Sequence, residues 1–322
     1  MRVQAVDDPG ESMKLRAVLL VAVASMMAVM PTDDLLAQDK KKSKQKKTRE
    51  SSFSLKGFEK VRFKQTPQGE LHLHVLKPEG WKAADQRPGI VFFFGGGWNG
   101  GSPGQFEQHC RYLASRGMVA ITAEYRVKSR HSTSPFECVK DGKSAVRWIR
   151  AHADVLGIDP ERLAAGGGSA GGHVAASTGT TKTIVEDGED LSVSHVPNAM
   201  ALFNPVYNNG PGQYGHDRVK NKWREISPAH NIRRGVPPAI VFFGSRDKLV
   251  TVETAEAFQS AMKKVGSDSE LHVTEGAGHG WFNYGKDGNK AFIDTVTKMD
   301  RFFAKLGWIE GKPKVREFLA AR

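Results

Sequence analysis

The sequence predicts an α/β fold with a mostly parallel sheet, and three observations support this prediction. From residue 58 onward, short apolar runs alternate with helix-like stretches, which is the order of strands and helices in a parallel sheet. Several runs, such as residues 90–94 and 239–243, are continuously apolar, as strands buried on both faces must be. The 322-residue chain is also long enough, without its N-terminal segment, for one large domain.

Eight strands and five helices are expected in this domain. The first two strands alternate in polarity and flank a turn with Pro67 and Gly69, which predicts an antiparallel start to the sheet. The expected strands are residues 60–64, 71–76, 90–94, 119–124, 163–167, 200–203, 239–243 and 270–273. The expected helices, which would cover both faces, are residues 105–116, 135–153, 170–177, 252–265 and 289–306.

The N-terminus has the composition of a secretory signal peptide, predicted over residues 1–37. Two basic residues precede an apolar run over residues 17–30, and the small residue Ala37 follows it. This run of fourteen residues is short for a bilayer span, so no stable membrane anchor is expected. Met13 is an alternative start, because the twelve residues before it include three acidic side chains. The protein is therefore expected to be secreted or periplasmic.

Residues 38–57 are predicted to form a basic flexible linker, since seven of the twelve residues from 39 to 50 are Lys or Arg. Adhesion to an anionic wall or polymer is the alternative interpretation. The formal net charge of the chain is +12. No helix-turn-helix, zinc-finger or RNA-binding aromatic signature accompanies this charge, so no nucleic-acid partner is expected. The sequence leaves the oligomeric state open.

The strongest local motif is the run of residues 167–171, Gly-Gly-Ser-Ala-Gly, which places Ser169 between a predicted strand and a predicted helix. At such a turn the glycines remove clashing side chains, and the serine hydroxyl stands clear of the sheet. The N-terminal amides of the helix then face the site and favour negative charge. Ser169 is therefore a candidate nucleophile, and a plain glycine turn is the alternative.

A second glycine run, Gly95 to Gly97, follows the predicted strand at residues 90–94. Backbone amides can approach a developing oxyanion only where no side chain intervenes, which a glycine run provides. A flexible loop and a phosphate-binding loop are the alternatives. The phosphate interpretation is weak, because no Gly-Lys-Ser/Thr follows the run.

A nucleophilic serine needs a base, and the base needs a carboxylate that orients it. Asp247 follows the predicted strand at residues 239–243, and His279 lies in a glycine-flanked loop after the last predicted strand. The order serine, acid, histidine is the one that α/β-hydrolases use. Asp141 and Asp159 are alternative acids, but both precede Ser169.

Together these motifs resemble the hormone-sensitive-lipase-like and acetyl-xylan-esterase-like branch of the α/β-hydrolases, over nearly all of residues 58–306. Further matching segments are Glu124-Tyr125-Arg126, Asp159-Pro160-Glu161-Arg162, Ser227-Pro228 and Pro237-Pro238.

The resemblance implies an α/β-hydrolase catalytic domain over residues 58–322. About eight residues separate the basic run from Phe58, which is too few for an N-terminal helical cap, so no large cap domain is expected. It implies that Ser169 is the nucleophile, His279 the base and Asp247 the orienting acid. The implied oxyanion hole consists of the amides of Gly96, Gly97 and Ala170.

One position departs from the family pattern. The family usually has a histidine before the glycine run, and this chain has Phe94 there. That side chain transfers no proton, so we expect activity to survive with altered packing of the loop.

Three aromatic residues, Trp98, Trp281 and Tyr284, flank the motifs. Trp98 and Trp281 are candidate substrate-binding residues, since aromatic rings stack on sugars; packing beside the site is the alternative. His72 and His74 share one face of a predicted strand, and without a third ligand we expect a solvent-facing pair and no metal site.

Two cysteines, Cys110 and Cys138, follow the predicted signal peptide. They are interpreted as buried small apolar residues, while a disulfide between them stays open.

These features favour a secreted serine carboxylesterase that needs no metal or organic cofactor and acts on a small-molecule or carbohydrate ester. The segment before residue 58 and the polar stretch between the strands at 200–203 and 239–243 contain no long amphipathic helix. A lid over a fatty chain is therefore not expected, which favours short acyl groups, acetyl above all, on a bulky alcohol such as a polysaccharide. The alternatives are a peptidase, an amidase or formamidase, and a non-catalytic binding protein.

Overall fold

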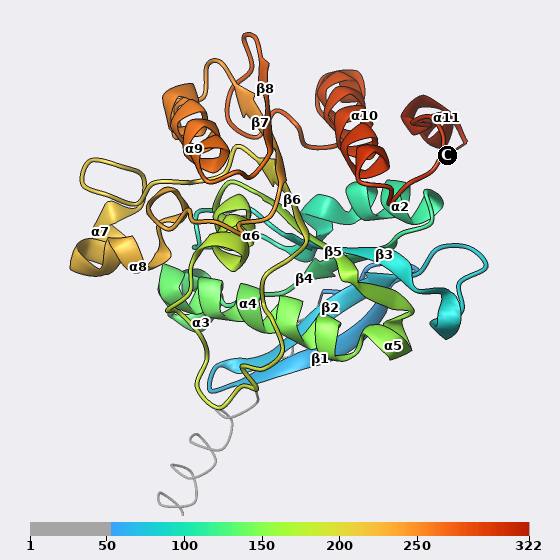
Figure 1. Ribbon diagram of the computed structural model, residues 1–322, viewed down its shortest axis with the longest axis horizontal. Helices are drawn as coiled ribbons and strands as arrows, with labels where there is room; N and C mark the ends of the chain where they lie inside the picture. Colours follow the sequence, from blue (N-terminus) through green and yellow to red (C-terminus); the bar gives the residue numbers. More distant parts are fainter. Residues whose placement is uncertain (1–52, 322) are drawn as a thin grey trace, which may run out of the picture. The chain divides into compact units, whose positions relative to one another are not determined.

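The computed structural model describes residues 53–321, through which one eight-stranded sheet runs (Figure 1). The strand order is β1-β2-β4-β3-β5-β6-β7-β8. The pairs β1–β2 and β2–β4 are antiparallel and all other pairs are parallel, which confirms the predicted architecture. The strands are β1 (Glu59–Thr66), β2 (Gly69–Leu76), β3 (Arg87–Phe93), β4 (Val119–Ala123), β5 (Ile158–Gly168), β6 (Ala199–Phe203), β7 (Ala239–Gly244) and β8 (Ser269–Thr274).

The predicted signal peptide and residues 38–52 of the predicted linker lie outside the described residues. Between residues 53 and 321, no helix combines the length and the apolar character that crossing a membrane requires.

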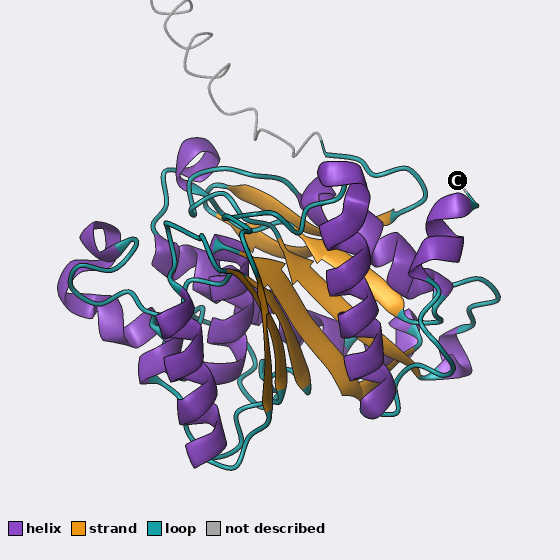
Figure 2. Cartoon of the chain, turned by 90° about the horizontal axis from the view of Figure 1, so that it is seen from above, coloured by secondary structure: helices purple, strands orange, loops and turns teal. Residues whose placement is uncertain are grey.

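Helices cover both faces of the sheet (Figure 2), because the inner strands carry apolar side chains on both sides. In β3, Val91 and Phe93 point to one face and Ile90 and Phe92 to the other, and all four are fully buried. The first face packs against α4, α6 and α9, and the second against α2, α10 and α11. The helices are α2 (Glu107–Ser115), α3 (Lys128–His131), α4 (Pro135–Ala151), α5 (Ala153–Leu156), α6 (Ala170–Thr180), α7 (His216–Val219), α8 (Trp223–Ile226), α9 (Val252–Lys264), α10 (Lys290–Lys305) and α11 (Val315–Ala320), with 3-10 turns at Ala83–Asp85, Pro103–Phe106, Lys220–Lys222, Pro228–His230 and Asp287–Asn289.

The segment between β6 and β7 matters for access to the site. It contains α7 and α8, each of 4 residues, and two 3-10 turns, which the sequence did not predict. Such short helices bury too few side chains to leave a periodic pattern in the sequence. The described chain between these two strands therefore carries no large cap domain, as expected.

The two cysteines are buried on opposite faces of the sheet. Cys138 belongs to the apolar cluster beneath α4 and α6, and Cys110 to the cluster beneath α2 and α10. Both are free thiols with no exposed surface, and Cys138 donates its S–H to the carbonyl oxygen of Arg126 at 3.0 Å. The disulfide that the sequence left open is not formed.

The expectation that His72 and His74 face solvent was wrong. They lie on β2, an inner strand between β1 and β4, and are only 8% and 1% exposed. Their ring nitrogens Nδ1 and Nε2, respectively, each lie 3.2 Å from a carboxylate oxygen of Glu124, which follows β4. A buried carboxylate thus satisfies both rings where water was expected.

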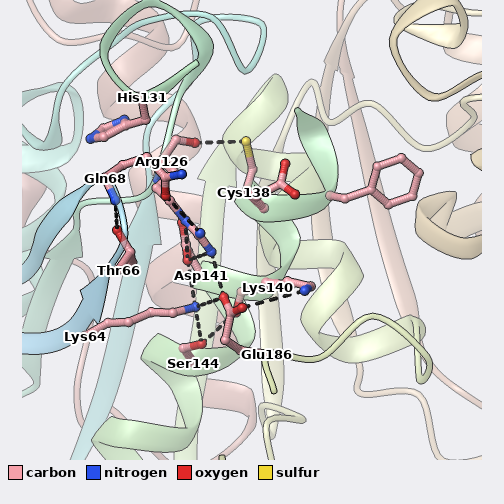
Figure 3. Close-up of polar contacts among 12 residues, drawn as sticks. Lys64, Thr66, Gln68, Arg126, His131, Cys138, Lys140, Asp141, Ser144 and Glu186 are labelled. Atoms are coloured by element: carbon pink, nitrogen blue, oxygen red, sulfur yellow. Dashed lines mark hydrogen bonds and ion pairs between the residues drawn. The ribbon is translucent and has the colours of Figure 1, made fainter. Parts of the chain in front are cut away.

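A buried ion network ties β1, α4 and the segment after α6 together (Figure 3). Lys64 Nζ lies 2.7 Å from both Asp141 Oδ1 and Glu186 Oε2. Arg126 binds the same two carboxylates, at 2.8 Å and 2.6 Å. Burial alone would raise the pKa of Glu186, but the hydrogen bonds and charges of Lys64 and Arg126 outweigh it and lower the pKa to about 2. Glu186 therefore stays ionised and anchors its segment.

Replacing Glu186 tests this anchor. We expect Glu186→Gln to lower the free energy of unfolding at pH 7 by roughly 1–3 kcal/mol, because two buried cations lose a carboxylate partner. The pKa of Glu186 is lowered in the folded state, so its stabilisation is complete above the ordinary pKa of 4.5 and is lost as the pH falls toward 2. The difference between variant and wild type should therefore shrink over that range, as measured by urea unfolding at several pH values.

The matched control is Asp294→Asn, which breaks the exposed ion pair between Asp294 and Lys298. This change should alter stability by less than about 0.5 kcal/mol at any pH. A loss for Glu186→Gln that is as large at the lowest pH as at neutral pH would contradict the assignment.

Candidate active site

Ser169 lies on a strained turn between β5, which ends at Gly168, and α6, which begins at Ala170. Its backbone angles are φ 55° and ψ −120°, which a residue with a side chain rarely adopts. A Cβ atom on Gly171 would lie 2.0 Å from the carbonyl oxygen of Phe93, so only glycine fits there. The flanking glycines of the motif thus allow a turn that holds the serine at the carboxyl end of the sheet.

The three residues that the sequence singled out as nucleophile, base and acid converge at this edge. Nε2 of His279 lies 2.8 Å from Oγ of Ser169, and Nδ1 of His279 lies 2.7 Å from Oδ2 of Asp247. An ionised carboxylate only accepts hydrogen bonds, so Nδ1 carries the proton and Nε2 presents its lone pair to the serine hydroxyl. The arrangement has the geometry of a nucleophile, a general base and an orienting acid.

Asp247 is held as an anion. Its side chain is fully buried, and its Oδ1 accepts hydrogen bonds from the amides of Leu249 at 2.9 Å and Val250 at 3.1 Å. Burial by itself would raise the pKa of Asp247, but the hydrogen bond from His279 and those two amides outweigh it and hold the pKa below its ordinary value. The carboxylate of Asp247 is therefore held in one position and in its ionised form.

The glycine loop after β3 exposes two backbone amides beside Ser169. Gly96 and Gly97 have φ angles of 126° and 60° and line the same cavity as Ser169. In the described chain neither amide donates a hydrogen bond to another group, whereas the amide of Gly95 donates to Oε1 of Gln105 at 2.5 Å. Ala170 is the first residue of α6, where amide groups have no partner within the helix.

Phe94 and Tyr125 fix the base of this loop. Phe94 is fully buried and stacks on Tyr125, with 4.2 Å between ring centroids. The hydroxyl of Tyr125 donates to the carbonyl oxygen of Phe94 at 2.5 Å. Burial raises the pKa of Tyr125 well above its ordinary value, so this hydroxyl keeps its proton and the bond persists. Phe94 thus supports the glycine loop by packing against Tyr125.

A cavity of about 390 Å³ opens in front of Ser169 and His279. Its wall includes residues from the loops after β3, β6, β7 and β8. The lining residues are Gly95, Gly96, Gly97, Asn99, Gln105, Ser169, Asn204, Tyr214, Arg218, Leu249, His279, Gly280, Phe282 and Asn283.

Neither tryptophan proposed for substrate binding lines this cavity. Trp98 is 1% exposed, and its indole N–H donates to Nδ1 of His173 at 3.2 Å. Nε2 of His173 lies 2.8 Å from the carbonyl oxygen of Ile226, and burial lowers the pKa of His173 to about 4, so the ring is neutral.

Trp281 lines a separate hollow of about 530 Å³ beside the loop that carries His279. Tyr284, the third aromatic residue, is 42% exposed and packs against Phe292.

Several residues of the cavity wall were not predicted from the sequence, among them Asn204, Tyr214, Arg218 and Asn283. Asn204 alone left a signal, because it follows directly the strand at 200–203 and therefore lies at the functional edge of a parallel sheet. The others lie in irregular loops that carry no periodicity.

The two alternative acids are engaged elsewhere. Asp141 belongs to the buried ion network, and Asp159 binds Arg162 at 2.8 Å. Among residues 53–321, no group of three or more His, Cys, Asp or Glu side chains is arranged to hold a metal ion.

Two family models match the chain in succession. A model described as BD-FAE matches residues 73–201, and the dienelactone hydrolase family model matches residues 205–307.

Among curated proteins, the esterase LipC of Mycobacterium tuberculosis is 31% identical over 227 residues, which cover 62% of this chain and 56% of LipC. A probable isoprenylcysteine alpha-carbonyl methylesterase of Arabidopsis thaliana is 26% identical and covers 66% of this chain and 48% of its own length. The chain thus spans about half the length of the curated relatives that it matches.

Solved structures match over a larger share. Esterase 2 of Thermogutta terrifontis, phosphoramylated by tabun, is 44% identical with a TM-score of 0.79, covering 82% of this chain and 100% of the esterase. The same esterase with propionate bound is 44% identical with a TM-score of 0.77, covering 80% of this chain and 97% of the esterase. Because a relative this similar is covered along its whole length, the chain belongs to the α/β-hydrolase superfamily, in the hormone-sensitive-lipase-like branch of its esterases.

Proposed function

We propose that this chain is a serine carboxylesterase that hydrolyses short-chain acyl esters through Ser169. The observation that carries the proposal is the continuous line of hydrogen bonds from Ser169 through His279 to Asp247, 2.8 Å and 2.7 Å long. A serine hydroxyl becomes an effective nucleophile when a base contacts it and a third group orients that base. The similarity to named esterases supports the same reaction class.

In the first half of the proposed reaction, Nε2 of His279 takes the hydroxyl proton of Ser169 while Oγ bonds to the ester carbonyl carbon. The carbonyl oxygen becomes an oxyanion, which the amides of Gly96, Gly97 and Ala170 stabilise. His279 then gives its proton to the alcohol oxygen as the carbon–oxygen bond breaks. The alcohol leaves and an acyl-serine remains.

In the second half, a water molecule loses a proton to His279 and its oxygen bonds to the acyl carbon. The proton passes to Oγ of Ser169 as the acid departs, which restores the resting state. Asp247, whose pKa lies below its ordinary value, remains ionised throughout and stabilises the positively charged imidazole. Protein groups and water serve every bond change in this sequence.

The proposed acyl group is short, acetyl above all. The cavity of about 390 Å³ is small for an enzyme pocket, and Leu249 and Phe282 are its main apolar wall. Esterase 2 of Thermogutta terrifontis has been solved with propionate and with butyrate bound, which supports a short acyl site in this chain. The polar groups of Tyr214, Arg218 and Asn283 suit a hydroxyl-rich alcohol, so we include acetylated polysaccharides among the substrates.

We further propose that residues 1–37 are a signal peptide, that residues 38–57 are a basic linker, and that residues 58–322 form the catalytic domain of a secreted or periplasmic enzyme. The charged, apolar and small-residue order of the N-terminal segment supports export. A polymeric substrate outside the cell fits that location.

Removing the nucleophile is the direct test. Ser169→Ala should lower kcat for an aryl acetate by roughly 10⁴–10⁶-fold, as in other serine triads, and abolish labelling by a serine-directed phosphonate. The matched control is Ser115→Ala, at the end of α2, whose hydroxyl donates to the carbonyl oxygen of Tyr112 at 2.6 Å. It should keep full labelling and turnover. Near-normal turnover in Ser169→Ala would refute the proposed mechanism.

Acyl selectivity is tested with aryl esters of increasing chain length. We expect kcat/KM for acetyl, propionyl and butyryl esters to exceed that for octanoyl esters by at least about tenfold, because a longer chain must leave the small cavity. Acetylated xylan and an aryl acetamide, assayed beside them, separate a polysaccharide esterase from an amidase. A preference for octanoyl esters would overturn the short-acyl proposal, and faster amide than ester turnover would favour the amidase.

Export is tested by expressing the full 322-residue chain in a bacterial host and measuring the mass of the protein recovered outside the cytoplasm. We expect a mature N-terminus at Gln38, directly after Ala37. Recovery of the uncleaved chain in the cytoplasm alone would argue against the signal peptide.

A further inference from the structure

Asn204 lies beside the imidazole of His279 and has no role in the mechanism above. It follows β6 directly, is fully buried, and adopts a φ of 35°, in the left-handed region that asparagine tolerates better than most residues. Its own amide donates to the carbonyl oxygen of Phe242 at 2.7 Å, which fixes its backbone to the neighbouring strand. The side chain is therefore presented from a rigid element.

The backbone amide of Gly280 determines which way the side chain of Asn204 faces. This amide lies 3.1 Å from Oδ1 of Asn204, and an N–H group can only donate, so the atom facing it must be the oxygen. The NH₂ group then faces Nε2 of His279 at 3.4 Å. Asn204 thus presents a donor to the ring nitrogen that also faces Ser169.

This orientation distinguishes the two protonation states of the base. When Nε2 is unprotonated, its lone pair is compatible with the facing N–H groups of Asn204 and with the hydroxyl of Ser169. When Nε2 carries a proton, Oγ of Ser169 can accept that proton, but the NH₂ group of Asn204 then faces another donor and loses its acceptor. The contact therefore favours the form of His279 that can accept the serine proton.

We propose that Asn204 is a positioning residue that holds the His279 loop through Gly280 and presents a donor to Nε2 of His279, which favours this nitrogen as the acceptor of the Ser169 proton. The inference rests on the proposed role of His279 as general base. Its consequence is that Asn204 extends activity to lower pH, because protonation of the free base is what ends activity on the acidic side.

Other charged groups also surround the ring and are retained in the test. Asp247, after β7, accepts from Nδ1 and favours the protonated ring. Lys286 reaches the same loop, with Nζ 2.9 Å from the carbonyl oxygen of Gly280, and Arg218 lines the cavity from the segment between β6 and β7. The positive end of α6 faces the site as well. Lys286, Arg218 and α6 disfavour a positively charged imidazole. Only a substitution confined to Asn204 therefore isolates the effect of Asn204 on the protonation of His279.

The decisive variant is Asn204→Asp, because a carboxylate keeps an acceptor for Gly280 and replaces the donor facing Nε2 by an acceptor. Aspartate also tolerates the left-handed backbone. We expect the acidic limb of the kcat/KM profile to move to higher pH by about one unit, since a nearby opposite charge favours the protonated ring. Asn204→Gly suits the positive φ. It should move the acidic limb in the same direction by a smaller amount, and it should lower the maximal kcat/KM about tenfold.

The matched control is Asn283→Ala. Asn283 donates to the carbonyl oxygen of Gly280 at 2.8 Å and accepts from Nε2 of Gln105 at 2.9 Å, so its loss loosens the same loop while Asn204 keeps both of its side-chain contacts. This variant should lower kcat while its acidic limb stays where the wild type has it. A limb that moves equally in Asn283→Ala and Asn204→Asp would show that loop mobility is responsible and would overturn the inference.

A readout that needs no turnover separates this inference from the proposed function. The pH at which the His279 ring is half-protonated is measured by NMR in the wild type and in Asn204→Asp. A midpoint about one unit higher in the variant supports the inference even if no ester is found to be hydrolysed. Coincident midpoints refute it even if the wild type is an active esterase.

Discussion

The close approach of α6 to its neighbours is the constraint on which the candidate site depends. Gly171 brings the first turn of α6 against the end of β3, and Gly142 on α4 leaves room for Val174, where a Cβ atom would lie 2.3 Å from Cγ1. Gly172 allows the same helix to touch Pro205, after β6. With α6 held on three sides, the turn at Ser169 has one position, and its unfavourable backbone angles are maintained by the surrounding packing.

The three consecutive residues after β4 connect this turn to the rest of the fold. Glu124 satisfies two buried histidines on β2, Tyr125 supports the glycine loop through Phe94, and Arg126 enters the buried ion network. One short segment therefore contacts strand β2, the loop proposed to hold the oxyanion, and the helix that packs against α6.

Much of the fold could be predicted because buried parallel strands leave a direct mark on the sequence. Runs such as Ile90 to Phe93 are apolar at every position. The candidate catalytic residues follow such runs. Ser169, Asp247 and His279 could be placed together for that reason: the carboxyl ends of parallel strands share one edge. Short helices such as α7 and α11 left no such mark.

What the sequence could not give was the direction of loop side chains and the identity of distant charge partners. Trp98 sits in the glycine motif, yet its ring turns inward to His173 instead of toward the cavity. Lys64 meets Asp141 across 77 positions of chain, and no local pattern encodes such a pair. The same limit hid the contact between Asn204 and Gly280, which lie 76 positions apart.

The two free cysteines lie in the separate helical layers on opposite faces of the sheet. Burial raises the pKa of both thiols well above the ordinary value, so neither forms the reactive thiolate while the surrounding layer is closed. No disulfide joins Cys110 to Cys138 in the structure. Because Cys110 and Cys138 report on opposite sides of the sheet, their rates of alkylation record separately how often each helical layer opens.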